Sequence, residues 1–165
     1  MIADAARFMI LCGVRTIEVR RLTWGQFDIP SATWTVPADG EAKYKTGRAT
    51  TIALSPAALA IIKKMQSGAQ CQYVFNRKGK PLGQKAIIRE LRACGVVETS
   101  HGFRSTVKVW GMKEAGYSAA LMNKVLGHVH GDENETAADR AYAHSEAYLE
   151  ERRPIMRAWA KYLGA

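Results

Sequence analysis

The sequence predicts an α+β fold that is mainly α: a helical domain with one small antiparallel sheet, of about three strands, near its N-terminal third. Two observations favour it. Most apolar residues recur at helical spacing, in segments bounded by cap residues and glycines. Two short alternating segments, 33–36 and 50–54, flank a turn-rich stretch, which is typical of a β-hairpin. No repeat or linker interrupts the 165 residues, so we expect a single domain, 1–165.

The expected elements follow from local signals, taken in chain order. The helices should cover residues 2–12, a segment from about 16, then 56–66, 84–94, 102–115, 118–126, 137–143 and 146–163. The strands should cover "TWTV" (33–36), "TTIAL" (50–54) and, as a short third strand, "YVF" (73–75). Gly13 and Gly127 are favoured residues just past a helix end. Ser55 before Pro56, and Ser118, are favoured N-caps.

The charge balance indicates a polyanionic partner. The chain has 24 Lys and Arg against 15 Asp and Glu, a net charge of +9. This excess favours nucleic acid first and an acidic membrane surface second. No apolar run approaches the length that spans a bilayer, so we expect no membrane segment. Cys12, Cys71 and Cys94 follow no ligand spacing and are typical of reduced thiols in a cytosolic protein.

The stretch "CGVRTIEVRRLTW" (12–24) places Arg15 in a turn after a glycine, with Glu18 one helical turn further on. A guanidinium in a turn can present two parallel N–H groups to a phosphate, and a carboxylate behind it would fix its aim. The alternative is an exposed ion pair of little energetic value.

The stretch "KYKTGRATTIALS" (43–55) places Lys45 at the tip of the expected hairpin. A lysine there can contact a phosphate or act as a general acid, because its ammonium carries a transferable proton. Lys43 competes for the same role, and the alternative is a solvated basic loop.

The stretch "SHGFRSTVKVWG" (100–111) places His101 and Arg104 three residues apart at the head of a helix. Residues at this spacing share a face, and a helix N-terminus favours anions. The pattern indicates a phosphate site; the alternative is a surface histidine and arginine on an ordinary helix.

The stretch "LMNKVLGHVHGD" (121–132) places His128 in a turn, directly after Gly127. "HVHGD" also spells His-x-His-x-Asp, a spacing that some two-metal hydrolases use. It lacks the following histidine and the alternation of strands and helices that such a site needs. We therefore expect no metal and no cofactor.

Two tyrosines, Tyr142 and Tyr148, stand near the junction of the last two expected helices. A tyrosine can be a covalent nucleophile when nearby cations stabilise its phenolate. The alternative for either is a packing residue of an amphipathic helix.

Together these motifs form an ordered set that resembles the catalytic domain of the tyrosine recombinases, or phage integrases, of the prophage and genomic-island type. The resemblance covers nearly all of the chain. It rests on "GVRTIEVRRLTWGQFD", "KTGR…ALS", "HGFRSTVKVW", "LGH" and "RAYAHSEAYLEERRPIMRAWAKYL". It implies that the catalytic residues are Arg15, Lys45, His101, Arg104, His128 and the nucleophile Tyr142, with Glu18 in support. The gap between His128 and Tyr142 is several residues longer than is usual in the family, which leaves Tyr148 as a second candidate nucleophile.

The resemblance also implies an activity and partners. The expected reaction is cleavage and rejoining of double-stranded DNA through a 3′-phosphotyrosine intermediate, which integrates or excises mobile DNA. We expect a monomer in isolation and a homotetramer on DNA, with the C-terminal segment docking in trans, although residues 146–163 could equally pack in cis. We expect a cytoplasmic, nucleoid-associated protein without a membrane partner.

The chain departs from the family at its front, since it starts at the first catalytic helix. We expect the core-binding and arm-binding domains to be absent. The sequence would then be a piece of a longer protein, a gene fragment or a stand-alone catalytic domain. Two rival functions stay open: a type IB topoisomerase-like nicking and closing enzyme, and a non-catalytic DNA-binding remnant. The intact set of six candidate residues argues against the remnant.

Overall fold

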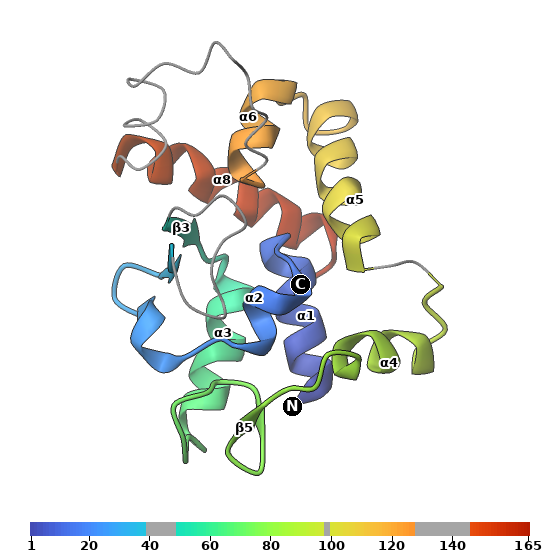
Figure 1. Cartoon of the computed structure of the whole chain (residues 1–165). Coiled ribbons are helices and arrows are strands. Elements are labelled where there is room, and N and C mark those ends of the chain that lie inside the picture. The colour runs from blue at the N-terminus through green and yellow to red at the C-terminus, as the bar shows by residue number, and fades with distance from the viewer. Residues whose placement is uncertain (39–48, 98–99, 128–145) are drawn as a thin grey trace.

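In the computed structural model, helices pack together with a small antiparallel sheet (Figure 1). The structure describes residues 1–38, 49–97, 100–127 and 146–165, apart from the side chains of 100–101 and 146–147. The helices are α1 (Ile2–Cys12), α2 (Thr16–Arg20), α3 (Pro56–Gln66), α4 (Ala86–Ala93), α5 (Ser100–Lys113), α6 (Ala119–Val125) and α8 (Glu146–Tyr162). The strands are β1 (Phe27–Asp28), β2 (Thr33–Val36), β3 (Thr50–Ala53), β4 (Asn76–Arg77) and β5 (Lys80–Pro81). The predicted fold class, α+β and mainly α, is confirmed.

The predicted hairpin strands pair as expected, but the third strand was predicted wrongly. The sheet has the order β1-β2-β3, with Trp34 opposite both Phe27 and Ile52. Residues 73–75 form no strand: Tyr73 makes only an isolated bridge to Thr23. Val74 and Phe75 are both buried, so this apolar run enters the core instead of alternating between two faces of a sheet. A separate two-stranded sheet, β4–β5, follows it.

The cap residues end and begin the helices as predicted. Gly13 follows α1 in the left-handed conformation, with φ of 61°. The hydroxyl of Ser55 accepts the N–H of Ala58 at 3.3 Å, and that of Ser118 accepts the N–H of Leu121 at 3.1 Å. Helix α5 begins at Ser100, two residues earlier than expected. The helix expected over 137–143 lies outside the described residues.

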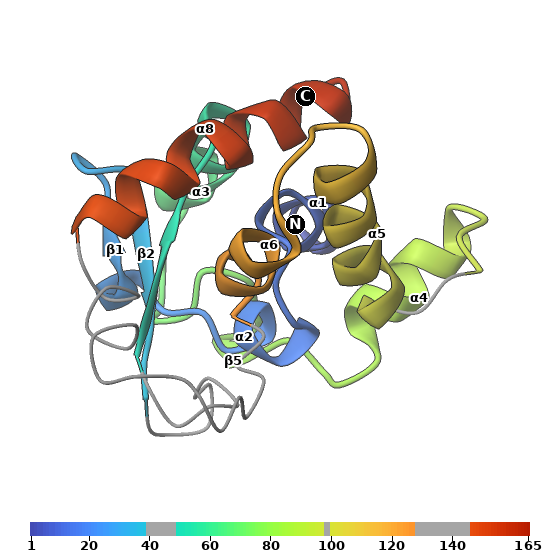
Figure 2. The same cartoon turned by 90° about the horizontal axis from the view of Figure 1, so that it is seen from above.

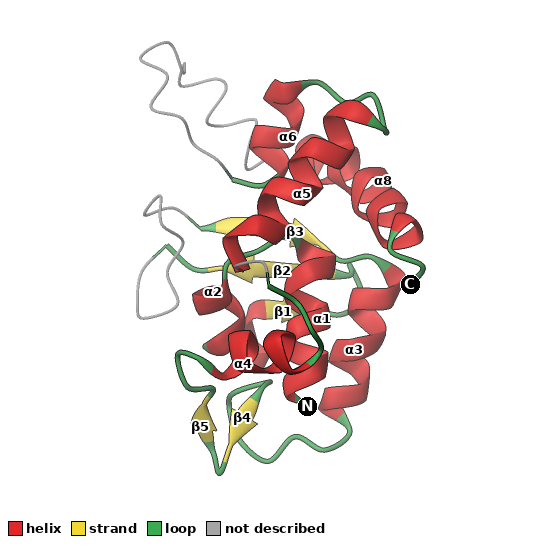
Figure 3. Cartoon of the chain, turned by 90° about the vertical axis from the view of Figure 1, so that its right-hand side faces the viewer, coloured by secondary structure: helices red, strands yellow, loops and turns green. Residues whose placement is uncertain are grey.

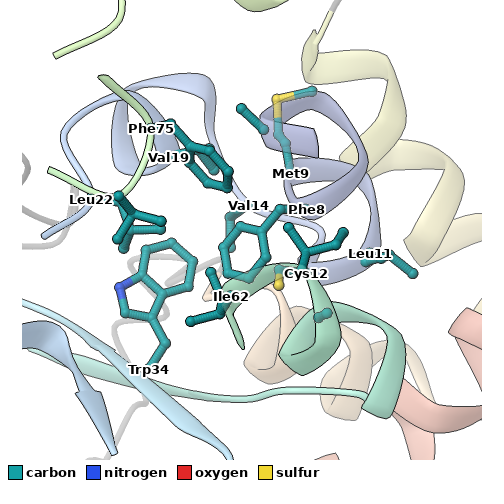
Figure 4. Close-up of a cluster of buried hydrophobic side chains, with 14 of the residues drawn as sticks. Phe8, Met9, Leu11, Cys12, Val14, Val19, Leu22, Trp34, Ile62 and Phe75 are labelled. Carbon is teal, nitrogen blue, oxygen red and sulfur yellow. The ribbon is translucent and has the colours of Figure 1, made fainter. Parts of the chain in front are cut away.

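Helix α1 separates two apolar clusters. On one side, Phe8 packs against Trp34 and Phe75, with ring centroids 5.5 and 5.9 Å apart (Figure 4). On the other, Trp110 of α5 and Trp159 of α8 pack together, with ring centroids 5.1 Å apart. Because both faces of α1 are covered, its last turn is held in place from both sides.

The C-terminal helix α8 packs in cis in this single chain. It crosses the sheet beside β3 and continues toward α5 (Figure 2). The indole N–H of Trp159 donates to the carbonyl of Ile10 in α1 at 3.0 Å. Helix α2 and the β4–β5 hairpin lie on the opposite side of the molecule from α8 (Figure 3). None of the helices within the described ranges is long and apolar enough to cross a membrane.

Replacing Gly13 with alanine should lower the free energy of unfolding by about 1–2 kcal/mol. The residue has a positive φ, and an added Cβ would lie 3.0 Å from Leu126 Cδ2. The measurement is urea denaturation followed by circular dichroism. Gly25→Ala is the control, since nothing lies within 4 Å of its Cβ position, and its stability should be unchanged or slightly raised. Equal stability of the two variants would contradict the prediction.

Candidate active site

A buried arginine, Arg104, joins the ends of two other helices. It lies in the first turns of α5 and is 1% exposed. One guanidinium nitrogen, Nη1, donates to the carbonyl of Gly13 at 2.7 Å, and Nη2 donates to the carbonyl of Leu126. Gly13 follows α1 and Leu126 follows α6. Helix C-termini leave carbonyls without intrahelical partners and favour cations, so both ends are suited to a guanidinium.

The same contact fixes the turns that follow both helices. Arg15 is two residues beyond Gly13, and His128 is two residues beyond Leu126. Gly127, between Leu126 and His128, adopts the left-handed conformation with φ of 58°. Arg104 therefore links the chain segments that carry two other predicted site residues. The alternative of a surface arginine at position 104 was wrong.

Arg15 and Glu18 form the predicted pair at the start of α2. The backbone N–H of Arg15 donates to Glu18 Oε2 at 2.7 Å, and its Nη1 donates to Oε1 at 3.0 Å. The Glu18 side chain is fully buried, whereas that of Arg15 remains 24% exposed. One carboxylate thus holds both the main chain and the guanidinium of Arg15, and this restricts the directions in which the side chain can point.

Two arginines meet the chain at this corner of the fold. Arg15 and Arg104 belong to one junction, since the carbonyl that Arg104 binds lies two residues before Arg15. Two permanently charged guanidinium groups held by buried contacts are suited to a tetrahedral oxyanion such as a phosphodiester. The roles of these residues in a reaction remain predictions.

The other predicted site residues are only partly within the described structure. His101 lies one turn before Arg104 in α5, where its backbone alone is described. Lys45, with its competitor Lys43, His128 with the His-x-His-x-Asp stretch, and Tyr142 all lie outside the described residues. Tyr148, the second candidate nucleophile, lies in α8 and is 4% exposed.

A second arginine, Arg152 of α8, is also buried, at 2% exposure, and was not predicted from the sequence. Its Nη1 donates to the carbonyl of Thr51 in β3 at 3.1 Å. The sequence did contain a signal. Position 152 precedes the buried Ile155, Met156 and Trp159 by three, four and seven residues, so a charge occupies the apolar face of this helix.

Comparison with known proteins identifies the family. The model of the phage integrase family matches residues 2–147. The chain belongs to the phage integrase family. Prophage integrase IntA of Escherichia coli (strain K12) is 33% identical over 165 residues, which cover 96% of this chain and 38% of that protein. The integrase of Enterobacteria phage P4 is 27% identical over 177 residues, which cover 96% of this chain and 39% of that protein. The chain thus spans less than half the length of these curated relatives.

Solved structures of integrases and recombinases share the fold. The Tn1549 transposon integrase in complex with transposon right end DNA superposes with a TM-score of 0.58 and 17% identity, covering 98% of this chain and 58% of that one. The XerH site-specific recombinase bound to difH substrate gives 0.57 and 18%, covering 91% and 45%. The family resemblance and the fold predicted for a phage integrase are confirmed.

Replacing Arg104 with lysine should lower the free energy of unfolding by about 1–3 kcal/mol. An ammonium has no planar fork and cannot hold both the Gly13 and the Leu126 carbonyls, so one buried acceptor would lose its donor. Chemical denaturation measures the loss. Arg7→Lys, an exposed exchange on α1, is the matched control and should change stability by less than about 0.5 kcal/mol. If Arg104→Lys lowered the free energy of unfolding no more than Arg7→Lys does, the two hydrogen bonds of Arg104 would contribute nothing to stability.

Proposed function

We propose that this chain is the catalytic part of a site-specific DNA recombinase, an integrase that cleaves and rejoins double-stranded DNA through a 3′-phosphotyrosine intermediate. The observation that carries the proposal is the junction at which Arg104 holds the α1–α2 turn beside Arg15. Membership of the phage integrase family supports it.

The two arginines would bind the scissile phosphate. Charge spreads over the non-bridging oxygens as the phosphoryl group is transferred, and donors fixed in advance stabilise it without reorganisation. Arg15, held by Glu18, and Arg104 would supply this charge, with His128 as a third donor. The arginines would neutralise the charge that Mg²⁺ neutralises in many phosphoryl-transfer enzymes, so the proposed reaction requires no metal or cofactor.

Tyr142 would attack the phosphorus. As its Oη–P bond forms, the bond from phosphorus to the 5′ oxygen breaks. His101 would accept the phenol proton, and Lys45 would donate a proton to the departing 5′ oxygen. The phosphotyrosine conserves the energy of the phosphodiester, so a 5′ hydroxyl can attack it and rejoin the strands without ATP. The burial of Tyr148 supports Tyr142 as the nucleophile, because the attacking oxygen must reach DNA.

The DNA-binding surface would extend from α2 over the neighbouring basic segments. Arg20 Nε of α2 donates to the carbonyl of Leu82 at 2.8 Å, which joins α2 to the segment that enters α4. There, Arg77, Lys85 and Arg89, with the single carboxylate of Glu90, line a groove of about 560 Å³. Such a surface would bind phosphates with little regard to sequence.

The assembly and location are part of the proposal. The chain would be a monomer in isolation and a homotetramer on DNA, with the C-terminal segment exchanged in trans between protomers. In the single chain that segment packs in cis through α8, so exchange would require it to leave its own protomer. Prophage and phage relatives support a cytoplasmic, nucleoid-associated protein.

Tyr142→Phe should abolish covalent attachment to DNA, with a loss of at least about 1000-fold. The substrate is a nicked duplex from which the short fragment that carries the new 5′ hydroxyl diffuses away, so the covalent adduct accumulates and is counted on a denaturing gel. Tyr148→Phe is the matched control and should keep most of the adduct. A strong loss in Tyr148→Phe alone would move the nucleophile to Tyr148. If neither variant nor the unchanged chain forms an adduct, the proposed activity is wrong, and the DNA-binding remnant becomes the better description.

Binding to duplex DNA should weaken steeply with salt, and single basic residues of the groove should each carry part of that dependence. Arg77→Ala and Arg89→Ala should each reduce the slope of log K against log salt concentration by about one. Fluorescence anisotropy at four salt concentrations measures this slope. Lys161→Ala, an exposed cation on α8, is the control and should leave the slope unchanged. If both groove variants kept the slope of the unchanged chain, DNA would bind outside this groove.

A further inference from the structure

The β4–β5 hairpin projects beside α4 as a small arm, with no fully buried side chain from Asn76 to Pro81 (Figure 3). Its two short strands are joined by Lys78 and Gly79, whose φ values are 54° and 74°. Two successive positive φ values are typical of a type I′ turn. A two-stranded hairpin is only marginally stable by itself, so the contacts at its base determine how firmly the arm is held.

The arm is strongly basic. Arg77, Lys78 and Lys80 are all exposed, and residues 71–85 contain no acidic residue. Arg77 lies directly opposite Lys80 in the ladder, and like charges in such a pair destabilise a hairpin. Arg77 also lines the groove of about 560 Å³ together with Arg89 of α4. A polyanion bound to the arm would relieve this repulsion, so the charges favour a contact with DNA phosphates.

Both ends of the arm are held by α2 and the residues that directly follow it. At the start of the arm, the N–H of Val74 donates to the carbonyl of Leu22 at 2.9 Å. At its end, Nε of Arg20 donates to the carbonyl of Leu82 at 2.8 Å. Within the described ranges, no other hydrogen bond joins α2 to residues 75–93. The side chain of Leu82 is 2% exposed in the core, so this residue is fixed through both its side chain and its carbonyl.

The two walls of the groove are therefore held differently. Helix α4 packs against α1, and its buried Ile87 and Leu91 belong to the same apolar cluster as α1, so its position does not require Arg20. The arm is held by α2. That helix begins directly after Arg15, whose backbone N–H and guanidinium both donate to Glu18. One short helix thus connects the base of the arm to the turn that carries Arg15.

We propose that Arg20 is a positioning residue that couples the arm to the catalytic turn. By holding Leu82 against α2, it fixes Arg77, which would bind a DNA phosphate outside the active site, relative to Arg15. A duplex bound to the arm would then present its scissile phosphate in the position that Arg15 requires. This inference rests on the proposed function, in which Arg15 binds the scissile phosphate.

The test is single-turnover cleavage of the same nicked duplex by the 165-residue chain, at a DNA concentration that saturates binding. Arg20→Met should change the Kd for the duplex by less than about threefold, because the cations of the arm and of α4 remain. It should lower the cleavage rate about 10-fold, because the scissile phosphate would be correctly placed less often. A residue that only stabilised the fold would lower the folded fraction, and hence the amount of adduct, but not the rate.

A double-mutant cycle identifies the path of the coupling. Arg77→Ala should slow saturated cleavage about 10-fold in the unchanged chain but less than about twofold in Arg20→Met, where the arm is already uncoupled. Arg89→Ala is the matched comparison, since it removes a cation from the opposite wall of the groove. It should slow cleavage by the same factor in both backgrounds. If the losses of Arg20→Met and Arg77→Ala multiply, or if Arg89→Ala is coupled as strongly, the inference is wrong.

Two further variants control for charge and for folding. Arg7→Met removes an exposed arginine of α1 and should change the Kd and the rate by less than about threefold. Arg20→Lys keeps the charge and a donor for the Leu82 carbonyl but not the planar geometry, so it should lose less rate than Arg20→Met. If thermal unfolding shows that Arg20→Met does not fold, the cycle is run with Arg20→Lys, and losses that multiply there overturn the inference equally.

The remaining outcomes separate this inference from the function beneath it. A fall in affinity without a fall in rate in Arg20→Met would make Arg20 an ordinary DNA contact and overturn the inference alone. If the unchanged chain forms no adduct, the proposed function fails, and the role of Arg20 fails with it.

Discussion

The arrangement of the site depends on one buried guanidinium. Arg104 donates to carbonyls at the ends of α1 and α6, and each of those helices is followed by a left-handed glycine, after which a predicted site residue comes in the sequence. Two helix C-termini that approach each other would bring partial negative charges together, and a cation between them offsets that repulsion. The same cation belongs to the proposed phosphate site. In the proposed reaction, the charge that holds this junction together would therefore also bind the phosphate.

Helix α1 carries this arrangement because it is packed on both sides. The cluster around Phe8 fixes it against the sheet, and Trp159 fixes it against α8 through the carbonyl of Ile10. Its last turn cannot shift without disturbing one cluster or the other, since packed interiors leave little free volume. The flexible end of the Arg15 side chain is held by Glu18 of α2. The direction of this guanidinium is therefore set by a local pair that directly follows a firmly packed helix.

What the sequence could predict was local. The helix ends at Gly13, Ser55 and Ser118 depend on neighbours within four residues, and so does the Arg15–Glu18 pair. The acceptors of Arg104 lie 91 and 22 residues away, so spacing could identify its helix face but not its burial or its partners. Residues 73–75 have strand-like composition, yet tertiary burial of Val74 and Phe75 decides their path.

Arg104 and Arg152 share a mode of binding that differs from that of Arg15. Both donate to main-chain carbonyls, which are neutral groups, whereas Arg15 donates to the carboxylate of Glu18. The α1–α2 turn thus carries one guanidinium in Arg15 and binds a second in Arg104. A positively charged site binds a group more strongly as that group gains negative charge. Such a site therefore stabilises a transition state in which charge develops more than it stabilises the bound substrate. In the proposed reaction the phosphoryl oxygens meet that condition as the phosphotyrosine bond forms.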